Sequence, residues 1–366
     1  MLASMMVMLY LSSNLLNYGG IVAQQTISVA EDQTESQASD SMEVCSPERN
    51  KAAPSYMVYG VTENHMGELK LSLAHMLKNM PSHWKIVVYD LGDLSQKSTD
   101  FLNSLCQVQV EKFNFKDWLG VDPADFPDQG AVWGALKGIT VCSWKIALIE
   151  HAFKDLFDNG KKCGYLLYGD ASLRINEKKF FVDQYHPSVA ERHGLFGMLT
   201  PAQKPTALET HPDTFVELNK ITDGRTNPDI NDYNNARSLQ MRGGLFITRP
   251  SFPGLLENVI TPAAECARNL NCVAPEGASG FKLSGVPAKY AITGWKHVCV
   301  RGLTGTCHRS DMSVYSILMR AWYLRPNSPK TPYAMPYSKS MDFGVEFIRN
   351  SNNLKSAKLK VCNNKN

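Results

Sequence analysis

Residues 164–170 read Gly-Tyr-Leu-Leu-Tyr-Gly-Asp, an apolar run that ends in a glycine and a carboxylate. A short run of this kind, bounded by glycines, predicts a buried strand. A second run, Lys85–Gly92 (KIVVYDLG), has the same form and places Asp90, like Asp170, where the chain leaves a strand for a loop. Ligands of α/β sheets bind beyond the carboxyl ends of the strands. Asp90 and Asp170 are therefore candidates for a binding site at one edge of a sheet.

The segments around these two runs alternate between strand and helix patterns. We expect further strands at 56–59, 108–113, 195–199 and 241–249, and helices at 66–80, 101–105, 149–157, 253–269 and 311–323. The first of these helices ends before Pro81, and Ser310 stands at the N-cap position of the last one. Such alternation predicts an α/β fold in which a parallel or mixed sheet carries helices on both faces.

Length, composition and charge exclude several classes of protein. The chain has 366 residues, 43% of them hydrophobic, which is too many for a wholly disordered protein. Its 38 Lys and Arg against 35 Asp and Glu leave a net charge of +3. Residues 1–48 contain six acids and no Lys or Arg, whereas 349–366 contain five bases and no acid. The body between them is only mildly basic, which argues against a protein that coats DNA or RNA.

Composition divides the chain into four segments. Residues 1–23 begin with the uncharged apolar run Met1–Leu11, which predicts a signal peptide or a weak signal-anchor; a disordered or packed N-terminus is the alternative. Residues 24–55 are rich in Gln, Ser, Thr and acids and predict a disordered stem. Residues 56–335 are the folded domain, and 336–366 are a loose basic tail. This layout predicts a protein of the secretory-pathway lumen (Golgi or endoplasmic reticulum) tethered near a membrane, or a secreted protein.

Nine cysteines fit an oxidising compartment. Two pairs are close enough along the chain for local disulfides, Cys266 with Cys272 and Cys299 with Cys307. The competing interpretation is a zinc cluster that uses His308 beside Cys307, although the spacings match no standard zinc motif. The odd count leaves at least one cysteine free or paired with another chain.

No standard catalytic motif accompanies the predicted strands. The sequence lacks the glycine-rich dinucleotide fingerprint, the P-loop, the metalloprotease His-Glu-x-x-His and the hydrolase Gly-x-Ser-x-Gly. Asp170 at a strand end can ligate a hard divalent cation that neutralises a diphosphate; an aspartate that caps a turn is the structural alternative. Lys145 can add a phosphate contact, or it can be an ordinary lysine on a helix surface.

A second polar cluster, Cys-His-Arg-Ser-Asp at 307–311, stands at the start of the last predicted helix. Free amide donors and the helix dipole favour anions there. His308 can ligate a metal, and Arg309 can bind a phosphate or a sugar. A solvated helix cap is the alternative for this segment.

Several short motifs occur in an order that resembles a known family. They are Val58–His65 (VYGVTENH), Lys85–Gly92, Ser143-Trp144-Lys145, Tyr168–Ser172 (YGDAS), Thr210-His211-Pro212, Gly243-Gly244, Cys266–Pro275 and Cys307–Ser313 (CHRSDMS). Over residues 56–325 the order resembles an uncharacterised invertebrate family of glycosyltransferase-like domains with a GT-A nucleotide-sugar fold. The resemblance implies one large GT-A-like domain, a transferase of the hexosyltransferase type. It would move a sugar from a nucleotide-sugar donor to a glycan, glycoprotein or glycolipid acceptor.

The resemblance also implies roles for individual residues. The donor-binding candidates are Asp90, Lys145, Asp170, Ser172 and Arg309. The acceptor-binding candidates are Gly243 and Gly244, whose lack of a side chain permits close approach. The candidates for the general base of an inverting mechanism are Glu265 and Asp311. Asp170 and His308 are the candidate ligands of a divalent cation (Mn²⁺ or Mg²⁺), and Ser172 stands where the DxD metal motif of such enzymes has its second acid.

Two other functions remain as alternatives. The first is a secreted, non-catalytic carbohydrate-binding or adhesion module on the same fold, which the replacement of an acid by Ser172 favours. The second is a phosphate-ester or nucleotide hydrolase that uses Asp170 and His308 on a metal. The hydrolase ranks last because the sequence lacks the additional carboxylates that two-metal sites use.

Overall fold

A seven-stranded mixed sheet lies at the centre of the described part of the chain. The computed structural model describes residues 45–120, 143–182, 190–191, 194–199, 205–234, 239–273, 275, 310–323, 334–335 and 345–347. The strand order is β3 (Val108–Lys112), β2 (Trp84–Asp90), β1 (Ser55–Val61), β4 (Leu166–Gly169), β7 (Met241–Thr248), β6 (Leu195–Leu199) and β8 (Ala334–Met335). The first four of these strands pair in parallel, β7 is antiparallel to both β4 and β6, and β8 is parallel to β6.

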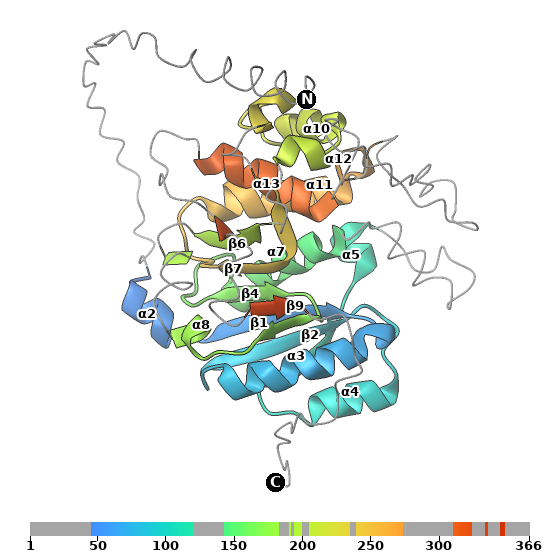
Figure 1. Ribbon diagram of the computed structural model, residues 1–366, viewed down its shortest axis with the longest axis vertical. Coiled ribbons are helices and arrows are strands. Elements are labelled where there is room, and N and C mark those ends of the chain that lie inside the picture. Colours follow the sequence, from blue (N-terminus) through green and yellow to red (C-terminus); the bar gives the residue numbers. More distant parts are fainter. Residues whose placement is uncertain are drawn as a thin grey trace, which may run out of the picture. The chain divides into compact units, whose positions relative to one another are not determined.

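Helices cover both faces of this sheet, as the alternating pattern predicted (Figure 1). Side chains of β1 alternate between two apolar cores: Met57 and Tyr59 belong to one, and Val58 to the other. The first core includes residues of α3 (Met66–Asn79), α4 (Gln96–Asn103) and α8 (Lys179–Val182). The second includes residues of α5 (Phe115–Leu119), α7 (Ser143–Phe157), α10 (Pro212–Ile221), α11 (Thr261–Arg268), α12 (Leu270–Val273) and α13 (Ser310–Tyr323). Burial on both faces explains why the parallel strands read as continuous apolar runs.

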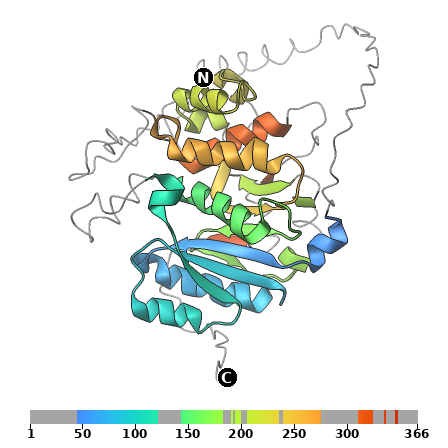
Figure 2. The same cartoon turned by 180° about the vertical axis from the view of Figure 1, so that it is seen from behind.

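The helix α7 connects the sheet to the helical layer above it. Figure 2 shows α7 in green between the blue strands and the orange α11. Its Trp144 packs so closely on β1 that a Cβ at Gly60 would lie 2.1 Å from the indole ring. Gly60 therefore fixes where the first turn of α7 sits on the sheet.

A bulge interrupts β7 at its glycine pair. Gly197 of β6 pairs with Phe246, and the next residue, Met198, pairs with Arg242. The three residues between these partners, Gly243 to Leu245, thus have no counterpart on β6. Bulges re-aim the backbone and are enriched next to active sites.

Most of the predicted elements are confirmed, with shifted ends. The helix predicted at 253–269 is a π-helical turn (Leu256–Ile260) followed by α11. Pro262 is near the start of α11 and follows directly on the π-helical turn. Ser310, predicted as an N-cap, is the first residue of α13.

The last part of the predicted stem is folded, which corrects its boundary. Cys45 is 3% exposed and forms a disulfide with Cys163, just before β4. Residues Pro47–Ala52 form the helix α2, capped by the Ser46 hydroxyl. The buried Asn50 accepts a hydrogen bond from the Gly164 amide at 2.9 Å. The prediction of a disordered stem up to residue 55 was wrong from Cys45 onward. Amino-acid composition does not reveal that a disulfide fixes this segment to the fold.

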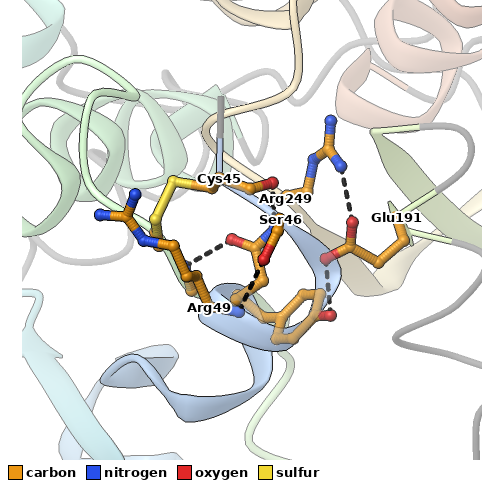
Figure 3. Close-up of polar contacts among 9 residues, drawn as sticks. Cys45, Ser46, Arg49, Glu191 and Arg249 are labelled. Carbon is orange, nitrogen blue, oxygen red and sulfur yellow. Dashed lines mark hydrogen bonds and ion pairs between the residues drawn. A yellow bond between two sulfur atoms is a disulfide. The ribbon is translucent and has the colours of Figure 1, made fainter. Parts of the chain in front are cut away.

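An ion pair lies in the same region (Figure 3). Glu191 accepts hydrogen bonds from Arg249 at 2.6 Å and from the Tyr165 hydroxyl at 2.8 Å. The Tyr165 amide in turn donates to the Ser55 hydroxyl at the start of β1. These contacts anchor the segment after Cys163 to two neighbouring parts of the fold.

The disulfide between Cys266 and Cys272 is confirmed, so this pair belongs to no zinc cluster. Cys106 is also disulfide-bonded, and all five cysteines among the described residues are therefore oxidised. The predicted partners Cys299 and Cys307 lie outside the described residues.

One part of the predicted loose tail is paired. Val345–Phe347 form β9, which runs antiparallel to β5 (Leu173–Ile175) in a second, two-stranded sheet. Val345 is 1% exposed, so this part of 336–366 contributes to the core and the prediction was wrong there. Among the described residues, no helix is both long and apolar enough to cross a membrane.

Candidate functional site

Asp170 lies directly after β4, at the carboxyl end of the strand, as predicted. Its amide donates to the Gly244 carbonyl at 3.0 Å, and its carbonyl accepts from the Leu173 amide at 2.8 Å. The second bond closes a four-residue turn that contains Ser172, which is 8% exposed. The turn fixes the backbone of Asp170, so its side chain projects from a rigid position.

Lys145 meets Asp170 from the first turn of α7. Its ammonium lies 2.8 Å from Oδ1 of Asp170 and donates to the Gly243 carbonyl at 3.4 Å. Only 12% of the lysine side chain is exposed. The sequence proposed both residues for donor binding, and the structure brings them together across three elements.

Asp311 reaches the same ammonium from the first turn of α13. Its Oδ2 lies 3.8 Å from Nζ of Lys145, and the residue is 5% exposed. Burial raises the pKa of Asp311 to about 6; Lys145 acts against this rise and Asp170 adds to it. Oδ2 accepts no hydrogen bond from the described residues. A buried acceptor without a donor is costly, and burial is the main cause of the raised pKa of Asp311.

The two glycines of the β7 bulge make room for the two aspartates. A Cβ on Gly243 would lie 2.2 Å from Oδ2 of Asp311. A Cβ on Gly244 would lie 3.0 Å from Oδ2 of Asp170 and 2.7 Å from the ring of Phe347. The sequence proposed these glycines for close approach of the acceptor. In the structure they allow the approach of the two carboxylates.

Tyr168 belongs to the site although the sequence did not propose it. Its hydroxyl donates to Oδ1 of Asp170 at 2.8 Å. The residue is two positions before Asp170 and therefore points to the same face. The two-residue spacing of Tyr168 and Asp170 in the YGDAS motif could have indicated from the sequence that Tyr168 belongs to the site.

Two other candidates are placed apart from this group. Asp90 ends β2, which is separated from β4 by β1. Its Oδ1 accepts from the amides of Gly92 at 2.6 Å and Leu94 at 3.2 Å, so it caps the turn after the strand. Glu265 is exposed on α11. Arg309 and His308 lie outside the described residues.

The described residues are a poor donor set for a divalent cation. Oδ1 of Asp170 already contacts the Lys145 ammonium and the Tyr168 hydroxyl. Ser172 offers a hydroxyl where a second carboxylate would be expected. Within the described ranges, no group of three or more His, Cys, Asp or Glu is placed to hold a metal ion. The described residues of the site therefore fit a resident ammonium better than they fit Mn²⁺ or Mg²⁺.

No protein-family model matches the chain, and neither does any curated protein. Solved structures that resemble it include the galactosyltransferase LgtC in complex with donor and acceptor sugar analogues (13% identity, TM-score 0.31, 56% of this chain and 61% of that one). Another is core-mannan synthase A from Aspergillus fumigatus in its Mn/GDP form (9% identity, TM-score 0.39, 65% of this chain and 72% of that one). A third is mouse xyloside xylosyltransferase 1 (11% identity, TM-score 0.35, 72% of this chain and 81% of that one). Likeness at this level assigns no residue and no activity, so the functional proposal rests on the site.

Proposed function

We propose that this protein is a glycosyltransferase of the hexosyltransferase type, which moves a sugar from a nucleotide-sugar donor to an acceptor hydroxyl. The observation that carries the proposal is the placement of the Lys145 ammonium between Asp170 and Asp311. These groups meet at the carboxyl end of β4, where α/β sheets bind ligands. The motif order that resembles glycosyltransferase-like domains with a GT-A fold supports the same activity.

The three side chains match the charges that develop during sugar transfer. The bond between the anomeric carbon and the diphosphate oxygen breaks, and its electron pair stays on that oxygen. Lys145 stabilises the resulting negative charge, and Asp170 holds the ammonium in position. On the acceptor side, the Asp311 carboxylate takes the hydroxyl proton as the oxygen bonds to the anomeric carbon. The configuration at that carbon is inverted in this scheme.

The environment of Asp311 suits the role of a general base. With a pKa of about 6, the carboxyl is ionised at neutral pH yet more basic than an exposed aspartate. A base with a pKa near the working pH combines the correct protonation state with a useful driving force. Of the two bases that the sequence suggested, Asp311 is thus the better supported, because Glu265 is exposed on another helix.

The oxidised cysteines support a place in the secretory-pathway lumen or outside the cell. Disulfides persist in oxidising compartments and are rare in the cytosol. Cys45–Cys163 and Cys266–Cys272 are such bridges, and Cys106 of the described body is disulfide-bonded as well. A glycan, glycoprotein or glycolipid in that compartment is the acceptor class that we propose, and the apolar leader and a membrane tether remain predictions.

A donor screen tests this function. The purified full-length protein is incubated with a panel of nucleotide-sugars and mixed glycan acceptors, with and without Mn²⁺, and free nucleoside diphosphate and glycosylated product are followed. The proposal expects release of nucleotide from at least one donor together with a product that carries the sugar. Sugar binding without release would favour the carbohydrate-binding module instead. Release of phosphate from nucleotides without sugar transfer would favour the hydrolase.

A further inference from the structure

We propose that Lys145 is the resident cation of this site, so that donor binding and transfer need no added divalent metal. The inference rests on the proposed glycosyltransferase function and concerns how the same site neutralises the diphosphate. Its starting point is the position of the ammonium, which lies between the carboxylates of Asp170 and Asp311.

The contacts of Asp170 argue first for this assignment. A divalent cation binds carboxylate oxygens at about 2.0–2.6 Å. Oδ1 of Asp170 has its two contacts from Lys145 and from the Tyr168 hydroxyl, both at 2.8 Å. A metal at Oδ1 would have to displace both groups. The other oxygen, Oδ2, would lie 3.0 Å from a Cβ on Gly244, and the Phe347 ring would lie 2.7 Å from the same Cβ.

The lysine itself is held in place. It leaves α7 in the first turn, next to Trp144, whose ring packs against the backbone of Gly60. Its ammonium lies 5.7 Å from the centre of the Trp144 ring and 5.9 Å from that of Tyr168. With 12% of its side chain exposed, Lys145 cannot move far without opening this packing. A dication that shared Asp170 and Asp311 would therefore stand close to an ammonium of like charge, which is unfavourable.

A second cation lies near the glycine pair. The guanidinium of Arg242 stacks on the Phe347 ring at 3.8 Å. The same ring would lie 2.7 Å from a Cβ on Gly244, and Oδ2 of Asp170 would lie 3.0 Å from it. Arg242 therefore adds positive charge on the side of Gly244 where Asp170 lies.

The chemical consequence concerns the leaving group. When the bond between the anomeric carbon and the diphosphate oxygen breaks, the electron pair remains on that oxygen. Lys145 stabilises this charge electrostatically and keeps its own proton, because a lysine ammonium is a strong point charge and a weak acid. The acceptor proton goes to Asp311, so atoms and charges balance without a metal.

Metal removal combined with substitution tests the inference. The full-length protein is treated with EDTA and assayed with its donor in chelator-treated buffer, and nucleoside diphosphate binding is measured by calorimetry under the same conditions. We expect turnover and affinity within about twofold of the values with Mn²⁺ or Mg²⁺. Lys145→Met should lose about 100-fold in turnover, the size of effect seen when one charge-stabilising group is removed. Lys154 lies on the exposed side of the same helix, and Lys154→Met should change neither the turnover nor the affinity for nucleoside diphosphate.

The outcomes separate this inference from the proposed function. If EDTA abolishes turnover and Mn²⁺ restores it, the protein is a glycosyltransferase and the assignment of Lys145 is wrong. If no donor is turned over with or without metal, the proposed function itself fails. Lys145→Arg keeps the charge and provides a folded variant should Lys145→Met not fold. Arginine should retain more activity than methionine in EDTA, and equal losses in the two variants would overturn the inference.

Discussion

Asp311 places a carboxylate in the protein interior, 3.8 Å from the ammonium of Lys145. The ion pair is longer than a hydrogen bond, so it offsets only part of the desolvation of the carboxylate. This balance explains why the pKa of Asp311 stays at about 6 although a cation is near. Because the desolvation of the carboxylate is only partly offset, the free energy of unfolding is smaller when Asp311 is ionised than when it is protonated.

The first prediction follows from the sign of this effect. The folded-state pKa of Asp311 is above the value of about 3.9 for an unfolded chain, so the folded protein binds the proton more tightly. The stability that the protonated carboxyl contributes is therefore lost as the pH rises from about 4 through about 6. Asp311→Asn removes this dependence. The free energy of unfolding in urea should be measured for both proteins at pH 4 and at pH 8. The value for the variant minus that for the wild type should be about 2 kcal/mol larger at pH 8 than at pH 4.

Asp223→Asn is the control for this experiment. Asp223 is exposed and has a φ of +49°, a conformation that asparagine accepts readily. The free energy of unfolding of this variant should differ from that of the wild type by the same amount over the whole pH range. A constant difference for Asp311→Asn as well would show that the folded state does not raise the pKa of Asp311.

Gly243 provides the second prediction at the scale of a residue. In Gly243→Ala, the new methyl group would overlap Oδ2 of Asp311, so the carboxylate or the helix that carries it must shift. We expect a loss of about 1–3 kcal/mol in the free energy of unfolding, together with a loss of donor turnover of at least tenfold. Thermal unfolding and the turnover assay measure the two effects.

Gly224→Ala separates these two effects. Gly224 has a φ of +79° and nothing within 4 Å of an added Cβ, so alanine there costs backbone strain without touching the site. A comparable loss of stability with unchanged turnover is the expected result. If Gly243→Ala also keeps full turnover, the position of Asp311 does not matter for the reaction.

At the scale of elements, the two disulfides differ mainly in the length of chain that they close. Cys45 and Cys163 are 118 residues apart, whereas Cys266 and Cys272 are six apart. In the chain-entropy model the longer loop stabilises the fold by about 5 kcal/mol and the shorter by about 2 kcal/mol. The long bridge also holds α2 beside the start of β4, where Asn50 accepts from Gly164.

Paired alanine substitutions test this difference. Cys45→Ala with Cys163→Ala should lower the free energy of unfolding in urea by about 2–3 kcal/mol more than Cys266→Ala with Cys272→Ala does. The second pair is the control because it closes a much shorter loop; its two cysteines are buried, as Cys45 is, whereas Cys163 is half-buried. Equal losses would show that loop length does not set the contribution of the long bridge.

The two strands that stand out most clearly in the sequence, β2 and β4, are buried on both faces. β2 and β4 have apolar side chains in both cores, so their runs stand out in the sequence. The missed elements lack this signal. β9 has three residues and becomes a strand only because β5 lies beside it. α2 has a polar composition and is held by Cys45, a contact 118 residues away in the chain.

At the scale of the whole molecule, the candidate site shows what a sequence can reveal and what requires the fold. Strand ends identified Asp170, and a short motif drew attention to Lys145. Their ion pair could not be predicted, because the sheet order and the position of α7 bring them together across 25 residues of chain. Asp311 is a further 141 residues along and reaches the pair through α13. The β7 bulge that admits both acids depends on pairing with β6 and β4.

The central claim is that this site transfers a sugar and that Asp311 takes the acceptor proton. The most direct test is the rate of nucleoside diphosphate release from the best donor, with acceptor present, for the wild type, Asp311→Asn and Asp223→Asn at pH 7.5. We expect turnover by the wild type and by Asp223→Asn, and a loss of at least 100-fold in Asp311→Asn, in the range typical of a general base. Wild-type turnover that survives unchanged in Asp311→Asn would contradict it.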